Sequence, residues 1–173
     1  MGKQLLRIKK AMGSMGIMPG VQPNLAHLAN LINAIHGQFH DIHFKANDTN
    51  VENKGHWDNL HAILGEYYER LYSDYDPTVE WAIASGLDTT ATNNSAAAIG
   101  YTTTERSVFE GYQYEEALRL VHDNLTLMCD VAALICNKFE DNALGIAIKN
   151  YLGNFLQHWA FELNYRIERR LKS

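Results

Sequence analysis

The chain has 173 residues, of which 46% are hydrophobic and 20% are charged. That length and composition fit one folded domain with an appendage, and they exclude a chain that is disordered throughout. No apolar run approaches the ~20 residues that cross a bilayer, and no apolar stretch follows the first cations as it would in a secretory signal. The sequence therefore predicts a soluble, cytoplasmic protein that is not in a membrane.

The net charge of −5 is distributed unevenly along the chain. Residues 1–10 carry +4, residues 166–173 carry +3, and the body between them carries −12. An acidic body with a basic N-terminal segment is typical of a protein with an appended polyanion-binding element.

Residues 4–12 have the pattern of a short amphipathic helix. The apolar residues share one face and the cations another: Leu5, Ile8 and Met12 against Lys3, Arg7 and Lys10. Residues 13–23 are punctuated by Gly and Pro, which is typical of a linker. We therefore expect residues 1–23 to form a basic N-terminal arm and linker outside the core, and residues 24–173 to form the folded domain.

Two long helices are predicted next in the chain. The first begins after Asn24, a residue suited to an N-cap, and should end near residues 47–50. Its apolar residues recur every three or four positions: Leu25, Leu28, Ile32, Ile35, Phe39 and Ile42. The second runs from residue 55 or 56 to residue 85, with Leu60, Leu64, Tyr67 and Leu71 inward. We expect Pro77 to kink or divide it, because proline lacks the backbone donor that a helix needs.

Two further long helices are predicted in the second half of the chain, after a long connection. Residues 86–104 are rich in Thr, Asn and Ala and read as a crossover that holds at most a short helix. A third helix is predicted over residues 114–138, and a turn follows at residues 140–142. The fourth helix carries one apolar stripe: Ile148, Leu152, Phe155, Trp159, Leu163 and Ile167. The predicted fold class is all-α, a ferritin-like four-helix bundle with one long crossover.

Histidines and carboxylates on the first two helices are the candidate metal ligands. Glu-x-x-His, the helical motif of di-iron bundles, is absent. His36, His40 and His43 lie beside the core stripe of the first helix, and for His36 and His40 a polar boundary role explains the position. The second helix carries His61 and the i, i+4 pair Asp76 and Glu80. An N-cap role before Pro77 explains Asp76 as well as a ligand role does.

The spacing of these ligands bears on where a metal could bind. His61 and Asp76 are 15 residues apart, which is ~22 Å along a helix. They cannot hold one ion within one chain. Antiparallel copies of this helix about a twofold axis would bring His61 of one subunit to Asp76 and Glu80 of the other.

These residues resemble the Dps family, the DNA-protecting mini-ferritins of bacteria. The resemblance spans residues 25–171 and is carried mainly by residues 56–86, from His-Trp-Asp-Asn-Leu-His to Ala-Ser-Gly, and by Gln-His-Trp at residues 157–159. It implies a four-helix subunit in a hollow dodecamer that oxidises Fe(II) with peroxide and stores ferric mineral. It places the inter-subunit iron ligands at His43, His61, Asp76 and Glu80.

Two departures from the family pattern concern this site. Gly65 stands where the family has an acidic residue, four positions after His61, and residues 46–55 hold an apparent insertion. Fe(II) favours carboxylate ligands beside imidazole. The missing acid predicts that iron is held weakly and that ferroxidase activity is low or lost.

Family members bind DNA through lysine-rich termini, a role that matches Lys3, Arg7, Lys9 and Lys10 in this chain. No base-reading motif is present, so binding to double-stranded DNA would be independent of sequence. The C-terminal cations are assigned to the dipole of their helix. Asp141 resembles an acidic residue of the family's iron pores, and an N-cap role explains it equally well.

The resemblance implies a nucleoid-associated shell that sequesters iron and protects DNA from oxidative damage. Two alternatives remain open at this stage. One is a fully competent ferroxidase in which Glu66 or the inserted loop replaces the lost acid. The other is a structural shell that compacts the nucleoid without iron chemistry.

Overall fold

A computed structural model describes residues 2–14, 21–44, 54–88 and 112–172. Its regular elements are all helical: α1 Gly2–Ser14, α2 Leu25–Phe44, α3 Lys54–Ala84, α5 Tyr114–Cys136, α6 Ala143–Leu156, the π-helix η2 Gln157–Leu163, and α7 Asn164–Leu171. Most of the predicted crossover, including any short helix in it, lies outside the described residues. No helix in the described ranges has an apolar stretch long enough to cross a membrane.

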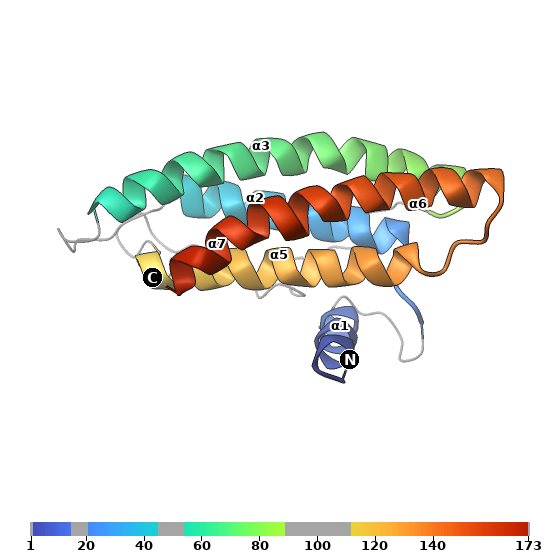
Figure 1. Cartoon of the computed structure of the whole chain (residues 1–173), viewed down its shortest axis with the longest axis horizontal. Coiled ribbons are helices and arrows are strands. Elements are labelled where there is room, and N and C mark those ends of the chain that lie inside the picture. The colour runs from blue at the N-terminus through green and yellow to red at the C-terminus, as the bar shows by residue number, and fades with distance from the viewer. Residues whose placement is uncertain (1, 15–20, 45–53, 89–111, 173) are drawn as a thin grey trace.

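The long helices run beside one another along the long axis of the molecule (Figure 1). α6, η2 and α7 form one continuous rod that returns along α5. α3 and α5 run in the same direction, while α2 and the α6–α7 rod run in the opposite direction. The end of α3 and the start of α5 therefore lie at opposite ends of the molecule.

The core forms where the apolar stripes of these helices meet. Every residue predicted for an inner face of α2, α3 and the α6–α7 rod is at most 3% exposed. Among the largest fully buried side chains are Phe39, Tyr67 and Trp159. Helical periodicity alone predicted this core correctly, because burying one face of each amphipathic helix dominates the packing.

Asn24 caps α2, as the sequence predicts. Its side-chain oxygen accepts a hydrogen bond from the His27 backbone N–H at 3.1 Å, and its own N–H donates to His27 Nδ1 at 3.2 Å. This is the reciprocal geometry of a capping box, with histidine in the place usually taken by Glu or Gln. The helix start is therefore held by two side chains, one before its first turn and one within it.

Of the two effects expected of Pro77, division of the second helix is wrong, because α3 continues through it from Lys54 to Ala84, whereas a kink stays a prediction. Asp76 consequently lies inside the helix and is not an N-cap. The turn next to the missing donor is reinforced from outside the ladder: the Asp74 carbonyl accepts hydrogen bonds from the Thr78 hydroxyl at 2.7 Å and the Tyr151 hydroxyl at 3.2 Å. Pro77 removes the backbone donor to the Ser73 carbonyl, so these bonds strengthen the adjacent turn and do not replace the missing one.

A buried polar network joins α3 to the last rod. Trp159 Nε1 donates to the Asp74 carboxylate at 2.7 Å, and Arg70 Nε donates to the same oxygen at 3.2 Å. The Tyr67 hydroxyl donates to the Leu163 carbonyl at 2.7 Å, at the end of η2. A π-helix changes which backbone groups its carbonyls bond to. Here the Tyr67 hydroxyl of α3 is the donor to the Leu163 carbonyl. The buried Asp74 carboxylate thus accepts from two N–H donors, one of which belongs to a charged arginine. This satisfies the requirement that a buried charge be paired.

The basic segment forms α1 and packs against α5 (Figure 1). Ile8 and Met12 are 3% and 6% exposed, and Arg7 donates to the Asp130 carboxylate at 3.3 Å. The sequence predicts that this segment lies outside the core, and the structure corrects that expectation for the apolar face. The reason is that an amphipathic helix gains free energy by covering its apolar stripe with any available apolar surface.

Candidate metal-ligand site and charged surfaces

Two of the four predicted metal ligands meet within one chain. His43, in the last turn of α2, stacks on His61 near the start of α3, with ring centroids 3.6 Å apart and an interplanar angle of 16°. His43 Nδ1 lies 3.0 Å from the His61 carbonyl, and His61 Nδ1 lies 3.0 Å from the His43 carbonyl. Each imidazole is thus oriented by the backbone of the other residue.

The reciprocal bonds determine the tautomer of both rings. A carbonyl oxygen can only accept, so each Nδ1 carries the proton and donates it. In the neutral ring, Nε2 then holds the lone pair. Burial and the neighbouring His61 ring lower the pKa of His43, which favours that neutral form. Histidines that bind metals are commonly held in this way, with the second nitrogen donating to a carbonyl or carboxylate.

Further aromatic rings of α2 and α3 lie beside the histidine pair. The Tyr68 ring lies 5.3 Å from that of His43 and 5.2 Å from that of His40, in edge-to-face contact with both. His36 contacts Tyr68 and Tyr72 farther along. His36 and His40 therefore pack against tyrosines at the edge of the core and do not join the stacked pair.

Asp76 and Glu80 are not brought to the histidines within this chain. Both are exposed and lie on the later part of α3, well beyond His61. Among the described residues, no group of three or more His, Cys, Asp or Glu side chains is arranged to hold a metal ion. One chain thus provides two imidazole ligands at one place and two carboxylates at another.

Gly65 lies directly beside the histidine pair. A Cβ built on this residue would meet His43 Cε1 at 3.5 Å, which is ordinary van der Waals contact. A larger side chain therefore has room to begin here, and its end would lie near the imidazoles. The position where the family has an acid is adjacent to the site in this structure, and glycine supplies no ligand there.

Glu66 is one of the two predicted substitutes for that acid. Its carboxylate accepts two hydrogen bonds from Arg166 Nη1, at 3.0 and 3.1 Å, across the interface with α7. The inserted loop, the other candidate, falls at residues 46–55, most of which lie outside the described residues. Glu66 is therefore paired with a guanidinium group of α7 and not with the imidazoles.

The predicted DNA-binding cations lie on α1. Arg7, Lys9 and Lys10 are exposed, and Arg7 is paired with Asp130 at 3.3 Å. The side chain of Lys3 lies outside the described part of the chain. Because the buried face of α1 packs on α5, the cations are presented by a packed helix.

Asp141 lies in the turn before α6 but does not cap that helix. The N-cap is Asn142, whose side chain accepts a hydrogen bond from the Gly145 backbone N–H at 2.8 Å. The Asp141 carboxylate pairs with Lys149, and that hydrogen bond lowers the pKa of Asp141. The N-cap interpretation of Asp141 is therefore wrong by one residue, whereas the pore interpretation stays a prediction.

Sequence reasoning missed two features that position these groups. It did not single out Asp74, whose burial depends on Trp159 from a distant helix. The resemblance placed His43 and His61 in one ligand set, but the stacking of their rings was not predicted, since spacing along two separate helices says nothing about the distance between them. No local signal distinguishes either feature.

Comparison with family models, with curated proteins and with solved structures finds no match for this chain. The functional assignment accordingly depends on the residues themselves. Their chemistry offers two oriented imidazoles on one half of the α2–α3 pair and two exposed carboxylates on the other half.

Proposed function

We propose that the protein is a Dps-like shell protein, which sequesters iron and binds DNA without sequence specificity, and so protects DNA from oxidative damage. The observation that carries the proposal is the stacked pair of His43 and His61, each with Nδ1 held by a carbonyl and Nε2 left for a ligand. The shared direction of α3 and α5 supports a ferritin-like four-helix bundle with one long crossover.

The incomplete ligand set within one chain favours a site shared by two copies. A second copy related by a twofold axis, with its α3 antiparallel, would bring Asp76 and Glu80 to the imidazoles of the first. The full set would then be two imidazoles and two carboxylates, donors that suit Fe(II). In a dodecameric shell, each such interface would take up iron as substrate and cargo.

Gly65 makes this site weaker than one with a full set of acids. Of its predicted substitutes, Glu66 is bonded to Arg166 and not to the imidazoles, and most of the inserted loop lies outside the described residues. We therefore favour weak iron binding with slow oxidation over a fully competent ferroxidase. A purely structural shell, the other alternative, would leave the orientation of two imidazoles without a use.

The test combines assembly with iron oxidation. Light scattering of the purified protein should give a large, stable oligomer. Wild type should oxidise Fe(II) with peroxide little faster than buffer does, whereas Gly65→Asp should be measurably faster, because the new side chain begins 3.5 Å from His43. Gly153→Asp is the matched control, because Gly153 is an open, exposed helical glycine on α6.

Each outcome has a distinct meaning. A stable monomer would contradict both the shell and the shared site. A fast wild-type rate that is abolished by His61→Ala would show a competent ferroxidase. If Gly65→Asp is as inert as Gly153→Asp in an assembled shell, the carboxylates of the second copy are not in register with the histidines.

A further inference from the structure

The histidine stripe of α2 holds a second pair of imidazoles that the proposed iron site does not use. His36 and His40 lie at i and i+4, so their side chains leave the same side of the helix. Their ring centroids are 6.4 Å apart, with an interplanar angle of 32°. Both residues belong to one turn of one chain, so a ligand of this pair does not require a second copy.

The contacts of these two rings are aromatic and leave their nitrogens open. His36 contacts Tyr68 and Tyr72, and His40 contacts Tyr68 and Phe44. Within the part of the chain that the structure describes, no hydrogen bond or ion pair engages either imidazole. Burial, with a smaller effect from His40, lowers the pKa of His36 below its ordinary value of 6.5, so at pH 7 this ring is mainly neutral. A neutral imidazole keeps one nitrogen lone pair for a ligand.

The spacing of the two rings is close to that of a shared metal ion. Histidines at i and i+4 hold one ion from one helical face in helical zinc motifs. An ion bonded to one nitrogen of each ring at about 2 Å, with a tetrahedral angle, brings the ring centroids to about 5 Å. The observed separation of 6.4 Å exceeds this by about 1 Å. A rotation of the exposed His40 ring is enough to close the pair.

The donor atoms indicate the class of ion. Imidazole suits zinc and copper, whereas Fe(II) favours carboxylate ligands beside imidazole. In the described ranges, no third His, Cys, Asp or Glu side chain is grouped with this pair to hold a metal, so water would fill the remaining positions. An ion held by two imidazoles and water is one for which nitrogen ligands alone give useful affinity.

We propose that His36 and His40 form a second metal site, which binds a divalent ion of the zinc and copper class in preference to Fe(II). The proposed iron site takes its ligands from two helices and from two copies of the chain. This second site takes both of its ligands from one turn of α2. It therefore stands or fails independently of the shell and of iron oxidation.

Calorimetric titration with Zn²⁺ at about pH 7.5, where imidazole is mainly neutral, tests the site in untagged His61→Gln protein, which lacks the stacked pair. One ion per chain should bind with a dissociation constant below about 100 μM. Addition of His36→Gln or His40→Gln should weaken binding at least about tenfold, because the remaining imidazole loses a partner held at high effective concentration. The matched control is His122→Gln, which removes a histidine of α5 that pairs with Asp123 and should leave binding unchanged.

Cu²⁺ provides a second readout and identifies the ion. Electron paramagnetic resonance of the Cu²⁺-loaded protein should show two coordinated nitrogens, and one after either His36→Gln or His40→Gln. Retention of Zn²⁺ against an equal concentration of Cu²⁺ would assign a zinc site, and its displacement a copper site. The proposal is overturned if neither ion binds, if Fe(II) binds more tightly than Zn²⁺, or if His122→Gln weakens binding as much as His40→Gln does.

Discussion

His27 occupies a position where its protonation state matters for the start of α2. Its Nδ1 accepts a hydrogen bond from the Asn24 N–H, and it can do so only while that nitrogen is unprotonated. Burial, with a smaller effect from Lys138, lowers the pKa of His27 below its ordinary value of 6.5. The folded protein therefore binds this proton less readily than the unfolded chain does.

This linkage predicts a loss of stability in acid. The contribution of His27 is fully present above the unfolded pKa of about 6.5 and is lost as pH falls below it. His27→Gln keeps an acceptor for the Asn24 N–H, as in an ordinary capping box, but does not titrate. Its free energy of unfolding should fall less than that of wild type between about pH 7 and pH 5, measured by urea denaturation. A His27→Gln profile that coincides with wild type would contradict the assigned hydrogen bond.

At the scale of the helix, α3 ends in a turn that needs a left-handed residue. Gly86 has φ of +74°. Its N–H donates to the Ile83 carbonyl at 2.9 Å, and the Leu87 N–H donates to the Ala82 carbonyl at 3.0 Å. These two bonds form a Schellman motif, in which glycine avoids the steric cost that other residues meet.

Two glycine substitutions should consequently have opposite effects. Gly86→Ala should destabilise the protein by about 1–2 kcal/mol, the cost of a left-handed residue with a Cβ. Gly153→Ala should stabilise it by about 0.5–1 kcal/mol, because Gly153 is inside α6 with open space around it. Chemical denaturation of both variants would decide this, and a change of the same sign in both would contradict the assigned backbone geometry.

The helix ends were predictable because their signals are local. Asn24 and Gly86 act on neighbouring backbone groups, and both mark a boundary in the structure to within about two residues. Pro77 is a local signal for a kink or a break, and the break is absent because α3 continues through this position. η2 was unpredictable, since its Leu163 carbonyl is satisfied by Tyr67 from α3.

For the whole molecule, the central question is how an acidic body could retain DNA. The cations of α1 are carried by a helix whose Ile8 and Met12 are buried. Of the proposed DNA-binding residues, Arg7 is paired with Asp130, and the other three are lysines. For the candidate metal site, the family resemblance named His43, His61, Asp76 and Glu80, but the stacking of His43 on His61 was not predicted, because the meeting of two helices is a property of the assembled core.

Substitution of Lys3, Lys9 and Lys10 by Gln should weaken DNA retention in a gel without disturbing the oligomer seen by light scattering. The log–log dependence of affinity on salt should become shallower by about 0.9 for each phosphate that the variant no longer neutralises. Lys149→Gln, on α6 and paired with Asp141, is the control and should retain DNA as wild type does. Undiminished retention by the triple variant would show that α1 is not the DNA-binding element.

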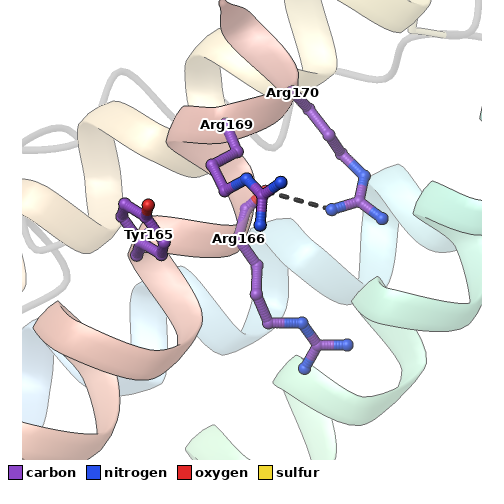
Figure 2. A pocket seen from close by; sticks show the side chains of 4 residues that line it. All are labelled: Tyr165, Arg166, Arg169 and Arg170. Carbon is purple, nitrogen blue, oxygen red and sulfur yellow. Dashed lines mark hydrogen bonds between the residues drawn. The ribbon is translucent and has the colours of Figure 1, made fainter. Parts of the chain in front are cut away.

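The π-helix also sets the rotational phase of α7. A regular α-helix turns by about 100° per residue, whereas in η2 the chain closes wider turns, as in the bond from the Asn164 N–H to the Trp159 carbonyl. Each residue there turns through a smaller angle, so everything after η2 is rotated relative to a direct continuation of α6. That rotation points Ile167 into the core and, with it, orients the arginine face of α7, which is formed by Arg166, Arg169 and Arg170 (Figure 2). Deleting one residue from η2 would rotate both by the same angle, so the arginine face of α7 cannot be re-aimed without unpacking the end of the core.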